Sequence, residues 1–189
     1  MQAKPRAQGL YQATGFYPGS EIPFVSVAMR TDQLATRAPE GTSSVFRPIL
    51  PQIKPRTQVA ILLPGELPVT LPDDTIYVNG MGEADEYSIV VGHTPDCSGA
   101  TVCSIGSFNA KRGGKVYPDE FEKTVSLVRG ITAYFSPLTC GASCSPPSIG
   151  WEYEGAFYRM HLEIDSRNPS QDEEIMVRLA NSAIEMGPR

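Results

Sequence analysis

The sequence predicts an α+β protein in which one antiparallel sheet of about six to eight strands carries a C-terminal amphipathic helix on one face. Three observations lead to this prediction. Short apolar runs with period-two alternation are separated by turn residues. Glycine and proline each occur 17 times, so many residues must lie in turns, sheet edges and extended segments. A single segment near the C-terminus has clear helical periodicity.

Length and charge narrow the class of protein. A chain of 189 residues, 41% of them apolar, can bury a sizeable core in one domain. The formal net charge is −5 and the basic residues are dispersed, so we expect no nucleic-acid partner. No apolar run approaches the roughly 20 residues of a membrane-spanning helix. The N-terminus shows no signal-peptide core, so we expect either a cytosolic protein or a mature chain with its signal peptide removed.

Four cysteines decide between these two readings of the N-terminus. Cys97 and Cys103 flank one short loop and Cys140 and Cys144 flank another, so we predict two local disulfides, with cross-pairing as the alternative. The C-x5-C spacing lies outside the range typical of zinc knuckles, so we expect no metal and no cofactor. Because disulfides persist in oxidising compartments, we expect a periplasmic or secreted protein.

Proline-rich composition divides the chain. We expect residues 1–56 to form a partly extended N-terminal arm and residues 57–189 to form the disulfide-stapled domain. Turns are expected at Gly80–Gly82 and at Lys111–Lys115, with a bulge at Gly130. The strands expected in the domain are residues 58–63, 75–79, 87–92, 103–110, 125–135, 148–154 and 156–165.

Two hairpins and the helix have the clearest patterns. The segment 87–112 predicts a hairpin whose loop is closed by Cys97 and Cys103. The segment 148–165 predicts a second hairpin with a tight turn at Glu154-Gly155. The helix is expected from a capping box at Ser170–Glu173 to a stop at Gly187-Pro188. Its predicted apolar stripe comprises Met176, Leu179, Ala180, Ala183 and Ile184.

Three blocks of the sequence carry a family resemblance. They are LPQIKPRTQVAILLPGELP (50–68), the hairpin 87–112, and the region 140–184 with CGASC, SIGWEYEGAFYRMHLE and MVRLANSAI. In this order they resemble a group of small, uncharacterised extracytoplasmic proteins of cyanobacterial type. The final hairpin and helix are also similar to domains attached to bacterial envelope regulators. Either resemblance implies an extracytoplasmic location and no particular catalytic residue.

Candidate binding residues lie at the stapled end of the first hairpin. His93 and Asp96 stand at the mouth of the cysteine loop, and with Trp151 they form the expected binding-loop set. His161 is expected to be a solvated histidine on the outward face of its strand. A cysteine nucleophile activated by His93 would need a free thiolate, which conflicts with the predicted disulfides.

The function expected from the sequence is therefore a non-enzymatic envelope or secreted binding or accessory domain for an unknown protein or small-molecule partner. The alternative is a small enzyme or thiol-redox protein that uses His93 and the cysteine loops. A third hypothesis, based on general layout alone, is an accessory subunit of an envelope or thylakoid-lumen complex.

Overall fold

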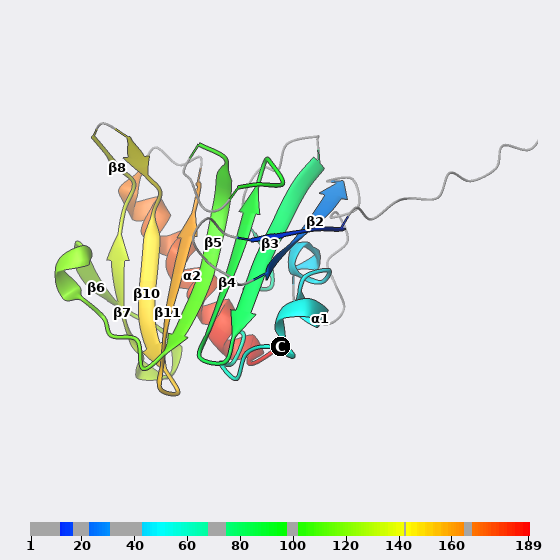
Figure 1. The fold of residues 1–189 in the computed structure, drawn as a ribbon. Coiled ribbons are helices and arrows are strands. Elements are labelled where there is room, and N and C mark those ends of the chain that lie inside the picture. The colour runs from blue at the N-terminus through cyan, green and yellow to red at the C-terminus, as the bar shows by residue number, and fades with distance from the viewer. Residues whose placement is uncertain are drawn as a thin grey trace, which may run out of the picture.

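One antiparallel sheet dominates the fold (Figure 1). The computed structural model describes residues 12–16, 23–30, 43–67, 75–97, 102–141, 143–164 and 168–189. Within them, nine strands form the sheet in the order β1-β2-β3-β4-β5-β11-β10-β7-β6, and β8 pairs with β9 separately. The strands are β1 (Gln12–Phe16), β2 (Pro23–Arg30), β3 (Thr75–Glu83), β4 (Glu86–Gly92), β5 (Ser104–Arg112), β6 (Lys123–Ser126), β7 (Thr132–Ser136), β8 (Thr139–Cys140), β9 (Cys144–Ser145), β10 (Ser148–Tyr153) and β11 (Ala156–Leu162).

The described residues contain few helical elements. An 18-residue helix, α2 (Pro169–Met186), follows the last strand, and a single turn, α1 (Leu50–Ile53), lies between β2 and β3. The described 3₁₀ turns are η2 (Ser44–Phe46), η3 (Pro118–Glu120) and η4 (Val128–Gly130). An antiparallel sheet with a C-terminal helix is the α+β architecture that the sequence predicts, so the predicted fold class is confirmed.

The strand order describes two meanders that meet in the middle of the sheet. Strands β1 to β5 follow one another as neighbours, and the chain then passes to the far edge at β6. From there it returns through β7 and β10 to β11, which pairs with β5. We call the β5–β11 pairing the seam. The connection from β5 to β6 contains η3, and we call residues 113–122 the crossover segment.

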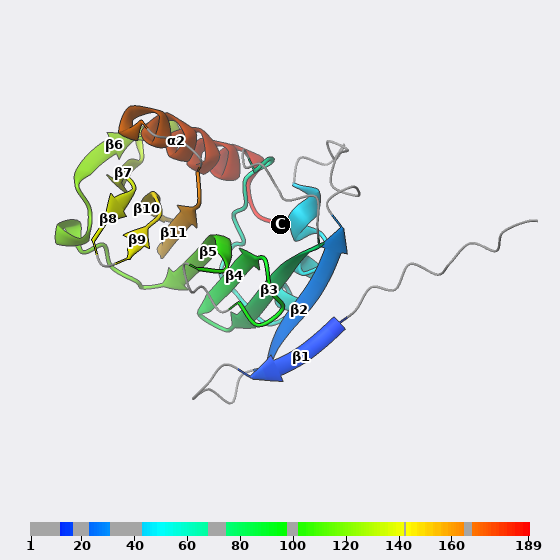
Figure 2. The ribbon, with the colours of Figure 1, turned by 90° about the horizontal axis from the view of Figure 1, so that it is seen from above.

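The two faces of the sheet differ in character. Figure 2 shows α1 and α2 on the same side of the sheet, and we call this side the helix face. Alternation along β10 and β11 places Ile149, Trp151 and Tyr158 on the helix face, where all three are buried. The opposite side, the polar face, carries serines, an arginine and a histidine from the central strands. A functional site built from polar side chains is therefore expected on the polar face.

Buried side chains from both ends of the chain share one core. Val45, Phe46, Ile49 and Ile53 belong to the same cluster of buried residues as the sheet and α2. The rings of Phe46 and Phe108 meet edge to face, with centroids 4.9 Å apart. The division of the chain at residue 57 stays a prediction, and the structure adds that residues before position 57 contribute to this core.

Residues 58–63 do not form the strand that the sequence predicts. The segment is extended but lies outside the sheet, with Ile61, Leu62 and Leu63 buried on the helix face. Its backbone bonds to tyrosine hydroxyls in place of a neighbouring strand. Tyr87 Oη accepts from Leu62 N–H and donates to Leu62 C=O, both at 3.2 Å, and Tyr158 Oη donates to Ala60 C=O at 3.0 Å. These hydrogen bonds satisfy buried backbone groups that a strand would pair in a ladder.

The predicted turns at Gly80–Gly82 and Lys111–Lys115 are also corrected. Gly80 to Gly82 lie inside β3, and the turn follows at residues 84–85. The glycine at position 80 has a packing reason, because a Cβ atom there would lie 2.7 Å from Ile49 Cγ1. Helix α1 can approach β3 closely only where the strand has no side chain. Lys111 and Arg112 continue β5.

The strand predicted at 125–135 is instead a hairpin. Strands β6 and β7 pair antiparallel around η4, with Val125 opposite Ala133. Arg129 and Gly130 both have positive φ, at 60° and 72°. The glycine that was expected to mark a bulge therefore belongs to a tight turn.

The final hairpin and the helix follow the prediction closely. Glu154 and Gly155 have φ values of 49° and 78° in the turn between β10 and β11. The five apolar residues predicted on the helix are all buried. The N-cap is corrected from Ser170 to Asn168, whose side chain accepts from Ser170 N–H at 3.0 Å. Pro169 at the first helical position favours this start because it has no N–H to satisfy.

Candidate functional site

Both predicted disulfides are present and both lie at the same end of the sheet. Cys97 bonds to Cys103, and Cys140 bonds to Cys144, so the local pairing is confirmed and cross-pairing is wrong. The first disulfide closes the loop between β4 and β5, and the second closes the small β8–β9 hairpin between β7 and β10. We call this end of the sheet the stapled end. Disulfides hold two of its connections in place.

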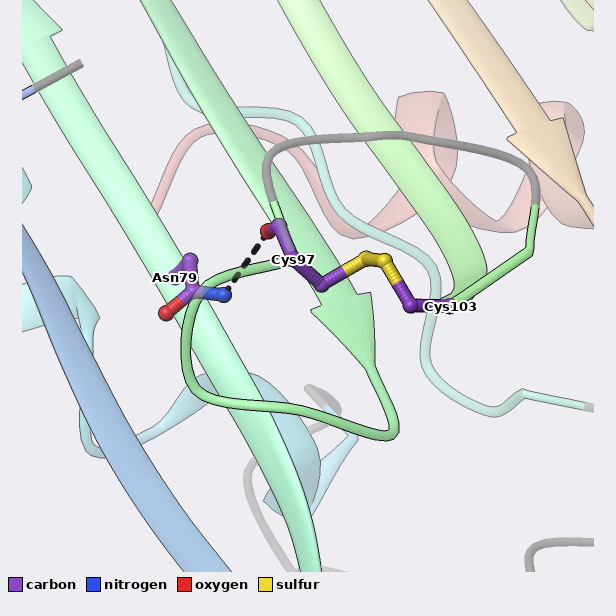
Figure 3. The surroundings of a disulfide bond; sticks show 3 residues. All are labelled: Asn79, Cys97 and Cys103. Carbon is purple, nitrogen blue, oxygen red and sulfur yellow. Dashed lines mark hydrogen bonds between the residues drawn. A yellow bond between two sulfur atoms is a disulfide. The ribbon is translucent and has the colours of Figure 1, made fainter. Parts of the chain in front are cut away.

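The first stapled loop folds over the sheet. Asn79 on β3 donates from Nδ2 to Cys97 C=O at 2.9 Å (Figure 3). Asn79 and its cross-strand partner Ser26 are almost fully buried. Within the described residues, Asn79 Oδ1 and Ser26 Oγ have no hydrogen-bond partner. This part of the polar face is therefore covered by the loop.

The uncovered part of the polar face contains a pocket of about 500 Å³. Its floor is a row of paired positions across four strands, with Ser107 on β5, His161 on β11, Ser148 on β10 and Ser136 on β7. We call these four residues the hydroxyl row. All four line the pocket, because paired positions in an antiparallel sheet point to the same face. The pocket thus crosses the seam between the two meanders.

Ser107 and His161 interact directly in this row. Ser107 Oγ lies 3.2 Å from His161 Nδ1, and Asn109 Nδ2 donates to the same Ser107 oxygen at 3.4 Å. The direction of the bond between Ser107 and His161 is set by which imidazole nitrogen carries the proton. Burial, together with the smaller effect of the Arg159 charge, lowers the pKa of His161 to about 4. The imidazole is neutral at pH 7, so the expectation of a solvated histidine is corrected.

The crossover segment forms one wall of the pocket. Glu120 accepts from Arg159 Nη1 at 2.8 Å, and the Arg159 guanidinium lies 4.9 Å from the centre of the Phe121 ring. Ser136 Oγ donates to Glu120 C=O at 3.3 Å. These contacts attach the crossover segment to β11 and β7. The lining also includes Thr139 and Ser145 from the second stapled hairpin and Pro146, which follows it.

Acidic side chains outnumber basic ones around the pocket. Asp119, Glu120 and Glu122 carry three negative charges, and Arg159 is the one cation among the described lining residues. Arg159 is already paired with Glu120. Asp119 and Glu122 form no ion pair with another described residue, so the mouth of the pocket has excess negative charge.

Exposed apolar side chains lie close in sequence to residues that line the same pocket. Among the described residues, the large hydrophobic side chains that are exposed are Val102 at 91%, Tyr117 at 63% and Leu138 at 42%. Each stands within two positions of a lining residue: Val102 precedes Ser104, Tyr117 precedes Asp119, and Leu138 lies between Pro137 and Thr139. We call these three residues the apolar rim. Apolar side chains exposed beside a pocket are typical of an interaction surface.

The predicted binding-loop residues are not brought together. His93 and Asp96 are exposed in the loop after β4, where His93 N–H donates to Cys103 C=O at 2.9 Å. Trp151 lies on the helix face, with no exposed surface, and stacks on Tyr158 with ring centroids 5.5 Å apart. A ligand at the stapled end could therefore contact His93 and Asp96 from solvent. Trp151 is part of the core on the helix face and is not accessible to such a ligand.

A second pocket, of about 630 Å³, lies along α2 and is a weaker candidate for the functional site. Its lining includes Glu66, Glu174, Arg178 and Glu185, and Arg178 Nε lies 3.8 Å from Glu66 Oε1. No residue of the apolar rim is close to it in sequence, and neither disulfide borders it.

Comparison of the chain with protein-family models, curated proteins and solved structures gives no match. The candidate site is therefore identified from its geometry alone. Within the described ranges, no cluster of three His, Cys, Asp or Glu side chains is placed to hold a metal ion. In the same part of the chain, no helix has the length and hydropathy needed to cross a bilayer.

Sequence reasoning missed most of the pocket. Ser107, Ser148 and Arg159 gave no motif, and Ser136 lay beyond the predicted strand 125–135. One signal was present: alternation along β11 placed Arg159 and His161 together on the outward face. The serines that complete the row come from strands whose register with β11 is fixed by tertiary pairing.

Proposed function

We propose that this protein is a non-enzymatic, extracytoplasmic binding domain whose partner site is the pocket at the stapled end of the sheet. The observation that carries the proposal is that each residue of the apolar rim lies within two positions of a residue that lines the hydroxyl-row pocket. Exposed hydrophobic side chains cost solubility, and here all three that the described chain exposes belong to connections that also contribute lining residues to this pocket. A pocket with a few convergent polar groups is the common form of a ligand site.

Two further features support binding over catalysis. The pocket floor consists of strand residues whose backbone N–H groups serve the sheet ladders, so they offer no free pair of N–H donors for an oxyanion. The Ser107–His161 pair is therefore better explained as part of a polar floor than as a nucleophile with its base. Cys97 and Cys103 are bonded to each other, so a thiolate activated by His93 has no support in this geometry.

The extracytoplasmic part of the proposal rests on the disulfides. Two bridges between cysteines a few residues apart are consistent with folding in an oxidising compartment. Membership of the small extracytoplasmic family of cyanobacterial type that the sequence resembles belongs to the same proposal.

A chemically mixed probe library tests the binding site. Backbone amide NMR signals of the oxidised protein would be followed with saccharides, amines, carboxylic acids and inorganic phosphate as separate groups. We expect one group to move the signals of Ser107, Ser136, Arg159 and His161, and Ser136→Tyr, which fills the pocket, to remove that response. Signals that move only along α2, or a response that survives Ser136→Tyr, would contradict the proposal.

A further inference from the structure

The charge and shape of the pocket point to one class of partner. We propose that the pocket receives a lysine or arginine side chain from a protein, and that the apolar rim packs against hydrophobic residues beside that cation. This inference rests on the proposed function, because it names the partner chemistry of the same pocket.

The lining of the pocket carries excess negative charge. Asp119 and Glu122 are exposed and have no ion-pair partner among the described residues, and Glu120 already neutralises Arg159. The described lining therefore carries two more negative charges than positive ones. An anionic group would meet repulsion here, whereas an ammonium or guanidinium group gains attraction from both free carboxylates.

The floor of the pocket offers hydroxyl oxygens to a ligand. Ser148 lines the pocket and is only 4% exposed, and its hydroxyl bonds to no other residue in the described part of the chain. Its oxygen is therefore available to an N–H donor that enters the pocket. Ammonium and guanidinium groups have several N–H donors and no acceptor, which suits serine and carboxylate oxygens.

The apolar rim favours a protein partner over a free amine. A small amine would occupy the polar pocket and leave the apolar rim exposed. Val102, Tyr117 and Leu138 come from three different connections, so together they offer contact area outside the pocket itself. Interfaces commonly combine a central anchor residue with surrounding apolar contacts that exclude water. A basic side chain beside aliphatic or aromatic residues fits both parts of this surface.

Selection from displayed random dodecapeptides tests the inference on the oxidised full chain. We expect enriched peptides to carry Lys or Arg next to apolar residues. The double substitution Asp119→Asn with Glu122→Gln should weaken their binding by about tenfold.

The matched control is Glu174→Gln with Glu185→Gln on α2, which removes the same charge from exposed carboxylates elsewhere and should leave binding unchanged. Val102→Ser and Leu138→Ser should each weaken binding without changing the preference for a cation.

The outcomes separate this inference from the proposed function. Acidic or uncharged peptides that lose affinity when Ser136→Tyr fills the pocket would overturn the inference and leave the pocket as a binding site. If the affinity of the peptides changes neither with the substitutions of Asp119 and Glu122 nor with Ser136→Tyr, the inference and the proposed function are both overturned. If no peptide is enriched and N-acetyl-lysine amide leaves the pocket NMR signals unmoved, the inference is overturned as well. Unchanged circular dichroism and two intact disulfides in every variant would show that folding is retained.

Discussion

Ser107 on β5 and His161 on β11 are direct cross-strand partners, and their side chains meet at 3.2 Å on the polar face. They lie 54 positions apart in the sequence. Their contact joins the two meanders of the sheet and places a neutral histidine in the lining of the pocket. The residues that define the candidate site are therefore set by the seam.

The low pKa of His161 predicts a loss of stability in acid. The folded-state pKa of about 4 lies below the ordinary value of 6.5, so the unfolded chain binds the proton first as the pH falls. This contribution is fully present above about pH 6.5 and is lost progressively between about pH 6.5 and pH 4. The ring is partly exposed, and charged side chains lie near it. We therefore expect the titration of His161 to change the free energy of unfolding by about 2 kcal/mol, which is less than the whole pKa shift would give.

Urea unfolding of the wild type and His161→Gln at about pH 7 and about pH 4.5 measures this contribution. Glutamine keeps a polar side chain but does not titrate. The free energy of unfolding of the variant should fall by about 2 kcal/mol less between the two pH values. Equal losses in the two proteins would show that another group governs the acid sensitivity.

The two disulfides should differ in their contribution to stability. Their closed loops are similarly short, so loop entropy alone predicts about 2 kcal/mol for each. Cys97, however, is buried and accepts a hydrogen bond from Asn79 at its carbonyl, whereas Cys140 and Cys144 are exposed. Replacing both members of the 97–103 pair by alanine should cost about 3 to 4 kcal/mol, compared with about 2 kcal/mol for the 140–144 pair. Chemical denaturation of the two double variants compares them directly, and a larger loss for the exposed pair would contradict this ranking.

The hydroxyl of Tyr87 is predicted to stabilise the extended segment 58–63. Burial raises the pKa of Tyr87 and the hydroxyl bonds to both backbone groups of Leu62, so Tyr87→Phe leaves a buried N–H and C=O unpaired. We expect a loss of about 2 kcal/mol. Tyr158→Phe is the matched control, because Tyr158 makes one such bond, to Ala60, and should cost about 1 kcal/mol.

Thermal unfolding and amide hydrogen exchange of residues 58–63 would measure the effect of the two substitutions. Faster exchange at Leu62 is expected in Tyr87→Phe. Equal stability of both variants and the wild type would mean that apolar burial alone holds the segment.

Gly80→Ala should destabilise the contact between α1 and β3. The new methyl group would lie 2.7 Å from Ile49 Cγ1 and would also meet Ile53. Overpacking of this kind costs about 1 to 3 kcal/mol. Gly141→Ala is the matched control, since a Cβ atom there meets nothing within 4 Å.

Combining Gly80→Ala with Ile53→Ala tests the origin of that loss. If the clash is the cause, the double variant should lose less stability than the sum of the two single variants. If the losses in free energy of unfolding of the two single variants simply add in the double variant, the cost of Gly80→Ala does not come from a clash with Ile53.

Local patterns predicted the local structure. The hairpin 148–165 and the helix could be predicted because alternation, a tight-turn dipeptide and a helical stripe all lie within a few residues of one another. The disulfide pairs were predictable for the same reason, since each closes a short loop. The strand prediction for residues 58–63 was wrong because its apolar residues also suit a buried strand. The hydroxyls that bond to its backbone belong to tyrosines that are distant in the sequence.

The candidate site depends on relationships that no local pattern contains. The sequence placed His161 on an outward face, but Ser107, Ser148 and Ser136 join it only through the register of β5, β10 and β7. The acidic residues of the pocket come from the crossover segment. The strand order requires this segment to reach the far edge of the sheet, but no local pattern in the sequence determines that it lies on the polar face. Trp151 attracted attention as the single tryptophan, yet the parity of β10 directs it into the core.

The position of the pocket across the seam has a kinetic consequence. Each meander consists of contacts between neighbouring hairpins, which close quickly, whereas pairing of β5 with β11 must bring distant parts of the chain together and is expected to be a late step in folding. A partner bound across the seam contacts both halves and would oppose their separation. Its occupancy would therefore slow local opening between β5 and β11, and amides along these two strands would report binding through slower hydrogen exchange.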